Sequence, residues 1–94
     1  MPIYDPVTNE ELKLGDVLRS FERGDMVYVD ELGEQFCAAE PLPTIRLGSF
    51  ADPMLMPFPG KLVGSPGSYQ LKGYTKQGAK RPKMRPARCS VFSE

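Results

Sequence analysis

Apolar residues at helical spacing mark the segment 9–23. Four of them stand at positions i, i+3, i+4 and i+7, as on one face of an amphipathic helix: Leu14, Val17, Leu18 and Phe21. Thr8 and Glu11 have the spacing of a capping box, and Gly24 is a natural stop. The pattern predicts a short amphipathic helix, which begins either at the capping box or with Asp16 as its N-cap.

Short β-favouring runs follow Gly24. Residues 26–29 and 35–39 flank an acidic stretch that contains Gly33, a residue able to take the positive φ of a hairpin loop. Residues 44–47 alternate between apolar and polar side chains, which is typical of a strand. We therefore expect an α+β fold, a short amphipathic helix with a small antiparallel sheet.

A second interpretation of the N-terminal half contains no helix. Residues 12–14 and 17–18 can be strands on either side of a turn at Gly15 and Asp16. The fold would then be a small SH3-like β-barrel.

Prolines divide the chain. Only Pro2 and Pro6 precede residue 41, whereas eight prolines stand from residue 41 onward. Prolines remove backbone donors and bias the preceding residue toward extended conformations. We expect a small domain over residues 1–50, then an extended Pro/Gly-rich C-terminal arm over residues 51–94, with one strand at 69–72 after a turn at 65–68.

Charge divides the chain at almost the same place. Residues 1–52 hold eleven Asp or Glu against four Lys or Arg, a net charge of −7, and residues 53–94 hold eight Lys or Arg against Glu94 alone, a net charge of +7. Such asymmetry indicates a polyanionic or acidic partner for the basic half. The domain is thus acidic and the arm basic.

The arm contains two candidate contact regions for a partner. Lys and Arg are concentrated near its end, where prolines forbid a continuous helix and favour an extended row of cations. These candidate residues are Lys76, Lys80, Arg81, Lys83, Arg85 and Arg88. Large apolar side chains gather between prolines upstream and need a surface to cover them, either the protein's own domain or a neighbouring subunit. These candidates are Met54, Leu55, Met56 and Phe58.

Several function classes are disfavoured by the composition. The chain has no His to act as a general base near neutrality and little core in which to shape a pocket, so we expect no enzymatic activity, cofactor or small-molecule substrate. Cys37 and Cys89 without His do not make a metal site; they either pair with each other or remain a small buried hydrophobe and an incidental thiol. No apolar run is long enough to span a membrane and the N-terminus lacks signal-peptide features. We expect a soluble protein, intracellular or within a virion.

These features together favour a non-enzymatic interaction or assembly protein, a subunit of a larger complex such as a virion. Its basic arm would dock on an acidic protein surface, which includes the surface of other copies of the same chain, since an acidic domain can receive the basic arm of a neighbour. Two alternatives remain at this stage. The arm can bind nucleic-acid phosphates with strong salt dependence, or the acidic half can imitate nucleic acid and inhibit an enzyme that acts on it.

Overall fold

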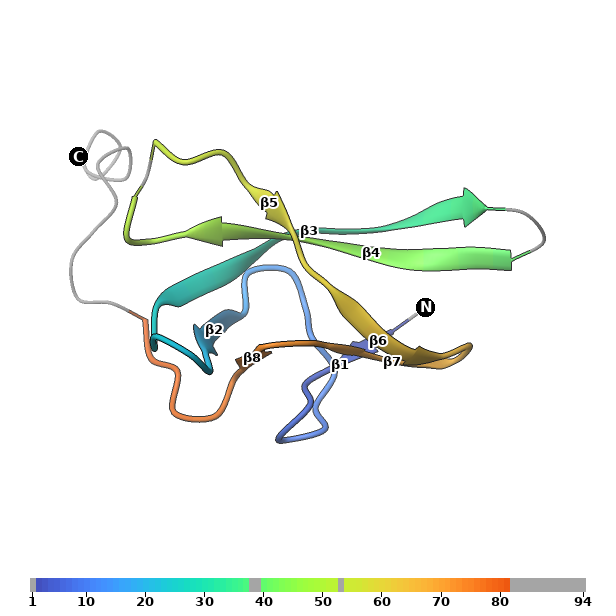
Figure 1. Cartoon of the computed structure of the whole chain (residues 1–94), viewed down its shortest axis with the longest axis horizontal. Helices are drawn as coiled ribbons and strands as arrows, with labels where there is room; N and C mark the ends of the chain where they lie inside the picture. The colour runs from blue at the N-terminus through green and yellow to red at the C-terminus, as the bar shows by residue number, and fades with distance from the viewer. Residues whose placement is uncertain (1, 38–39, 53, 82–94) are drawn as a thin grey trace.

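The computed structural model describes residues 2–37, 40–52 and 54–81, and within these ranges the chain forms strands and no helix. The strands are β1 (Ile3–Tyr4), β2 (Val17–Ser20), β3 (Met26–Cys37), β4 (Glu40–Ser49), β5 (Phe58–Pro59), β6 (Leu62–Ser65), β7 (Ser68–Leu71) and β8 (Tyr74–Thr75). β3 and β4 are much longer than the others and form one antiparallel hairpin (Figure 1).

The strands make two sheets. The larger has the order β5-β4-β3-β2-β8, and every neighbouring pair in it is antiparallel. The smaller has the order β1-β7-β6, in which β1 and β7 run parallel and β6 and β7 form a second hairpin. In Figure 1 the smaller sheet lies below β3 and β4 and forms a second layer under them, while the larger sheet curves down through β2 to β8 at the level of β7.

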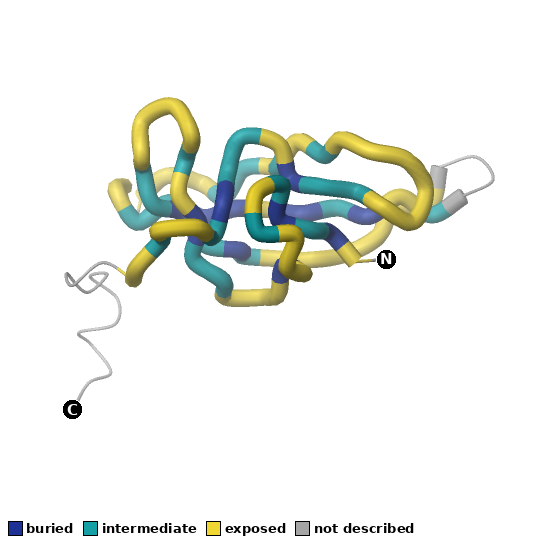
Figure 2. The backbone as a smooth tube through the Cα atoms, turned by 90° about the horizontal axis from the view of Figure 1, so that it is seen from below, coloured by how far each residue is buried: buried dark blue, intermediate teal, exposed yellow. Residues whose placement is uncertain are grey.

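The core lies between the two layers. Alternate residues of β3 and β4 point into it, as a half-buried antiparallel sheet requires. Its buried apolar members are Ile3, Leu12, Leu18, Val27, Val29, Ile45, Leu47 and Leu71. Phe58, Leu62 and Tyr74 pack against this set at its margin. Buried residues accordingly gather in the centre of Figure 2, and the outer loops are exposed.

Gly60 allows the chain to pass from one layer to the other. It lies between β5 in the larger sheet and β6 in the smaller one, and its N–H donates to the carbonyl of Ile45 at 2.9 Å. A Cβ at this position would lie 2.7 Å from Ile45 Cγ2 and 2.8 Å from Leu71 Cδ1. Only a glycine fits at this crossing without moving the core.

The predicted α+β fold is wrong, because the predicted helix within 9–23 is absent. Asn9 has a φ of 62° and Gly15 a φ of 88°, both incompatible with a right-handed helix. Of the four residues on the expected apolar face, only Leu18 is fully buried; Leu14 and Phe21 are exposed. Residues 17–20 form β2, where pairing with β3 replaces the intrahelical hydrogen bonds. The barrel interpretation also expected a strand at 12–14, which the structure does not contain.

The predicted hairpin turn around Gly33 is wrong as well. The predicted strands were 26–29 and 35–39. Residues 26–29 and 35–37 belong to the single long strand β3, where Gly33 pairs with Thr44, and residues 38–39 lie outside the described residues. The predicted strand at 44–47 is confirmed as part of β4. The continuous pairing with β4 satisfies the backbone of the acidic stretch, and a one-residue irregularity between Val29 and Glu31 accommodates the change of register.

The fold prediction of an extended arm after the domain is also corrected. β7 pairs with β1, β8 pairs with β2, and β5 pairs with β4, so strands from after residue 51 complete both sheets. Leu71 belongs to the core, which explains why this Pro-rich region folds. The predicted strand near 69–72 is confirmed as β7, and its preceding turn lies at Pro66 and Gly67. In the described ranges, no helix has the length and hydropathy needed to cross a membrane.

Candidate functional site

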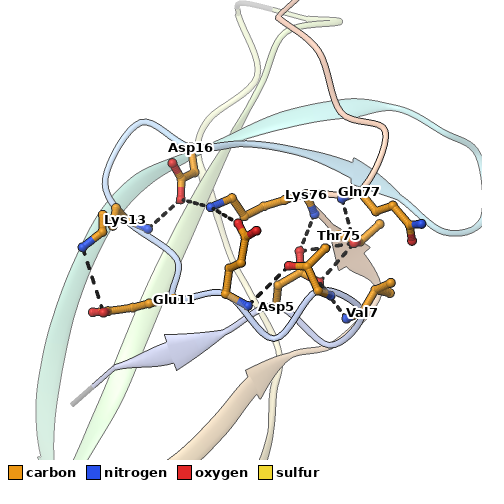
Figure 3. Close-up of polar contacts among 10 residues, drawn as sticks. Asp5, Val7, Glu11, Lys13, Asp16, Thr75, Lys76 and Gln77 are labelled. Atoms are coloured by element: carbon orange, nitrogen blue, oxygen red, sulfur yellow. Dashed lines mark hydrogen bonds and ion pairs between the residues drawn. The ribbon is translucent and has the colours of Figure 1, made fainter.

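A buried carboxylate, Asp5, joins the two ends of the described chain (Figure 3). Its Oδ1 accepts the N–H groups of Val7 at 2.7 Å and Thr8 at 2.9 Å, which closes a turn directly after β1. Its carboxylate also accepts the Thr75 hydroxyl at 3.1 and 3.2 Å and the N–H of Lys76. Asp5 is fully buried, and both oxygens of its carboxylate accept hydrogen bonds, as a buried polar group requires.

These hydrogen bonds decide the protonation state of Asp5. Burial alone raises the pKa of the Asp5 carboxyl, but the N–H groups of Lys76, Thr8 and Val7 and the Thr75 hydroxyl outweigh it. The pKa of Asp5 therefore lies below its ordinary value of 3.8. A charged, acceptor-only carboxylate is the form that suits four surrounding donors.

Lys76 forms the second half of this cluster. Its ammonium group lies 3.1 Å from Glu10 Oε1 and 3.3 Å from Asp16 Oδ2, and its side chain is only 25% exposed (Figure 3). Burial by itself lowers the pKa of Lys76, but the interactions with Glu10 and Asp16 together raise it by more. The pKa of Lys76 therefore lies above its ordinary value of 10.5. The site residue predicted to meet a partner thus serves, in this structure, to connect the end of β8 to the N-terminal loops.

Sequence reasoning missed Asp5 and its role. The signal was present, because an Asp followed by Pro and Thr is typical of a turn in which the Asp side chain accepts backbone N–H groups. The partner Thr75 could not be found, since 70 residues separate it from Asp5 and only the pairing of β8 with β2 brings it near.

The other predicted cations are placed differently from Lys76. Lys80 and Arg81 are exposed, and Arg81 Nη2 donates to the carbonyl of Gly15 at 3.5 Å. The predicted site residues Lys83, Arg85 and Arg88 lie outside the described residues.

The predicted apolar contact region separates into two parts. Met54, Leu55 and Met56 are exposed, with 87% exposure at Met54, on the loop between β4 and β5. Phe58 is half-buried in β5 and packs against the core. Three of the four predicted apolar residues thus remain uncovered in the single chain, whereas the fourth belongs to the fold.

A shallow open cleft of about 410 Å³ lies beside β2 and β8. Arg19 supplies its one charged side chain, and Phe21, Thr75 and Gln77 also line it. The Arg19 guanidinium already donates to the carbonyl of Gln77 at 3.5 Å. Ser20 and Thr75 contribute hydroxyl groups to the same lining.

The outer half of the β3–β4 hairpin extends past β2, whose pairing with β3 ends at Tyr28 (Figure 1). Leu32 pairs with Ile45 and Phe36 with Pro41, on the face that continues from the core. Leu32 is near the surface and Phe36 is 79% exposed. Glu34, which pairs with Pro43, lies between them on the same face, so the outer half of the hairpin carries both apolar and acidic side chains there.

Comparison with protein-family models, with curated proteins and with solved structures found no match for the chain. Among the residues that the structure describes, no group of three or more Cys, Asp or Glu is arranged to hold a metal ion. Within the described ranges, Lys80 and Arg81 are exposed cations, and residues 54–56 carry exposed apolar side chains.

Proposed function

We propose that the protein is a non-enzymatic subunit of a larger assembly, which docks on an acidic surface of a partner protein through its basic C-terminal residues. The observation that carries the proposal is the unbalanced charge of residues 53–93, which hold eight Lys or Arg and no Asp or Glu. Lys80 and Arg81, the described residues of the basic C-terminal segment, are exposed. Acidic groups of a partner would complement them.

The exposed apolar loop at 54–56 favours a protein partner over bare nucleic acid. Met side chains adapt to irregular apolar grooves and are used at protein interfaces, whereas phosphates offer them nothing. A contact that covers both this loop and the basic residues would supply apolar burial together with charge complementarity. This combination supports a protein surface as the primary partner.

The test is sedimentation of the protein in native extract through a density gradient, with and without nuclease. We expect the protein to migrate in a large complex that survives nuclease treatment. A variant with Lys80, Arg81, Lys83, Arg85 and Arg88 all replaced by Gln should migrate as a free, folded chain. The matched control carries Lys61→Gln and Lys72→Gln, which remove exposed cations outside this segment and should leave most of the complex intact.

Two outcomes contradict the proposal. Release of the protein by nuclease would identify nucleic acid as the partner, and the affinity for RNA or DNA would then fall steeply with salt concentration. Unchanged migration of the five-residue variant would show that the basic segment is not the docking element.

A further inference from the structure

The cleft beside β2 and β8 is built from separate segments of the chain. The loop after β1, β2 with the turn that follows it, and the end of β8 all contribute, and the lining includes Val7, Arg19, Ser20, Phe21, Thr75 and Gln77. The turn after β2 and the segment after β8 lie at the same end of the molecule (Figure 1), since β8 pairs with β2. A volume of about 410 Å³ is enough for one or two side chains of a ligand.

One part of the cleft is held in place by the buried Asp5 carboxylate. Asp5 accepts the N–H of Val7 at 2.7 Å and the Thr75 hydroxyl at 3.1 Å. The Thr75 hydroxyl in turn accepts the N–H of Gln77 at 3.0 Å. The backbone positions of lining residues from both ends of the described chain are therefore fixed before any ligand arrives. Such preorganisation lowers the entropy that is lost on binding.

β2 contributes Arg19, the charged side chain among the described residues that line the cleft. The Arg19 guanidinium donates to the Gln77 carbonyl at 3.5 Å and lies against Gly78, where an added Cβ would be 2.9 Å from Nη2. Arg19 is nevertheless exposed. Because a guanidinium carries several N–H donors, a single bond to a carbonyl orients it and leaves other donors for an anion.

Polar and apolar groups are combined in the rest of the lining. The Ser20 hydroxyl accepts the N–H groups of Glu22 at 3.2 Å and Arg23 at 3.4 Å, and its own hydrogen can be donated to a ligand. Phe21 is 53% exposed and Val7 is 49% exposed, so both offer apolar surface. The lining therefore suits a ligand that joins an anionic group to a large apolar one.

The charges near the cleft favour a single carboxylate over a chain of phosphates. Glu22 is exposed in the turn after β2, and Asp25, which follows in the same connection, pairs with Arg23 at 3.0 Å. A phosphate backbone that continued past the cleft would approach these carboxylates and be repelled. One carboxylate held at Arg19 avoids this repulsion.

The cleft adjoins the exposed cations that follow β8. The chain runs from Gln77, beside Arg19, to Arg81, whose guanidinium donates to the Gly15 carbonyl at 3.5 Å. It therefore follows β2 back toward the beginning of that strand. Lys80 and Arg81 are exposed on this path. A protein segment that places one residue in the cleft can meet these cations with further acidic side chains.

We propose that the cleft binds a short segment of a partner protein in which a carboxylate stands next to a large apolar side chain. Arg19 and Ser20 bind the carboxylate, and Phe21 and Val7 pack against the apolar side chain. That the segment belongs to a protein partner rests on the proposed function, whereas the binding chemistry of the cleft does not. The test therefore uses the purified full chain and a peptide probe.

The probe is acetyl-Asp-Phe-amide, titrated into the isotope-labelled full chain while the backbone amide signals are followed by NMR. We expect saturable shifts that are largest at Ser20, Phe21 and Gln77. Acetyl-Asn-Phe-amide lacks the charge and acetyl-Asp-Ser-amide lacks the ring. Each should bind about tenfold more weakly, the effect of one charged hydrogen bond or one buried ring.

Substitutions in the cleft assign each preference to a residue. In Arg19→Gln, acetyl-Asp-Phe-amide should bind about tenfold more weakly and no better than acetyl-Asn-Phe-amide. In Phe21→Ser, the preference for the peptide with the ring should disappear. Arg46→Gln is the matched control, because it removes an equal charge from β4, where Arg46 pairs with Asp30 and Glu31. Its affinity for the probe should equal that of the parent chain.

Several results would overturn the proposal. These are the absence of saturable shifts, equal affinity for the three peptides, and shifts confined to Lys80 and Arg81, since charge alone would then explain binding. Tighter binding of a short oligothymidylate at the same amides would assign the cleft to nucleic acid and overturn it as well. Should Arg19→Gln fail to fold, the three peptides compared on the parent chain decide.

Failure of this inference is distinguishable from failure of the proposed function. A nuclease-resistant complex in extract, together with a cleft that does not bind the probe, refutes the inference alone. Binding of the probe with the expected preferences, by a chain that sediments freely in extract, refutes the proposed function alone.

Discussion

Asp5 is the residue on which the connection between the chain's two ends depends. Its carboxylate accepts hydrogen bonds from residues on both sides of a 70-residue separation, and it is completely removed from solvent. An unpaired buried charge would be strongly destabilising, so these donors and the carboxylate require each other. Conversely, Thr75 and Lys76 have fixed positions because Asp5 holds them.

We predict that Asp5→Asn lowers the free energy of unfolding by about 1–3 kcal/mol, the cost of leaving buried polar groups unsatisfied. The amide replaces an acceptor oxygen with a donor that faces the N–H groups of Thr8 or Lys76. Urea denaturation at pH 7 measures this change. Asp52→Asn is the control, because Asp52 is exposed and accepts one backbone bond, from Met54. Equal stability of the two variants would contradict the assignment.

The same substitution has a defined pH dependence. Because the pKa of Asp5 in the folded chain is below its ordinary value of 3.8, its contribution is complete above that pH and is lost as the pH falls through the folded-state pKa. The stability gap between the parent chain and Asp5→Asn should therefore be constant near neutrality and close in acid. A gap that widened below pH 3.8 would show that the carboxylate is not the stabilising form.

Lys76 and Lys80 should respond differently to replacement, although they are near neighbours in sequence. Lys76→Gln removes ion pairs with Glu10 and Asp16 from a side chain that is 25% exposed, and we expect a loss of about 1 kcal/mol in unfolding free energy. Lys80→Gln should change stability little, since Lys80 is exposed. With a pKa above 10.5, Lys76 contributes below that pH and ceases to do so as the pH rises through its folded-state value. Paired denaturation curves at pH 7 and in alkali test both statements.

At the scale of elements, the sequence signals succeeded where they were strictly local. Alternation at 44–47 and the Pro-Gly turn before β7 were interpreted correctly, because strand alternation and turn chemistry depend on adjacent residues. The helix prediction failed because Leu14, Val17, Leu18 and Phe21 fit a helical face by spacing alone. Pairing of Val17 with Tyr28 and of Arg19 with Thr75 is a long-range preference that no local pattern contains.

The candidate site was predicted in part for the same reason. Charge and proline content selected residues 54–56, whose side chains are exposed, and a basic segment of which residues 83, 85 and 88 lie outside the described residues. Composition could not show that Lys76 forms ion pairs with Glu10 and Asp16, or that Phe58 belongs to the larger sheet. Both facts depend on which strands pair.

Gly60 provides a test of how the two layers meet. We predict that Gly60→Ala destabilises the fold by about 1–3 kcal/mol, because the new methyl group is forced against Ile45 and Leu71 in a packed core. Gly33→Ala is the control: an added Cβ there meets only the Thr44 hydroxyl, at 3.3 Å, on an exposed part of the hairpin. Thermal unfolding should separate the two variants, and an equal effect would mean that the crossing is loosely packed.

At the scale of the whole molecule, strands from the acidic half of the sequence pair with strands from the basic half. β1 and β2 come from the acidic part of the chain, and each is paired with a strand from the basic part, β7 and β8. Lys76 is neutralised by this interleaving through Glu10 and Asp16, whereas Lys80 and Arg81 lie past the last strand. Lys80 and Arg81 are exposed beyond the end of β8, whereas Lys76 directly after β8 is held by both carboxylates.

This arrangement predicts a sharp boundary for C-terminal truncation. A chain ending at residue 81 keeps the whole core and the contacts of Asp5, but one ending at residue 75 loses the Lys76 N–H and ammonium group. For a loss of about 2 kcal/mol, the shorter chain should unfold roughly 8–16 °C lower, at about 4–8 °C per kcal/mol for a domain of this size. A chain ending at residue 78 retains Lys76 and should match the one ending at 81. If instead stability declined evenly from 81 to 75, length rather than Lys76 would be the determinant, and the Asp5 cluster would not be the point at which the fold closes.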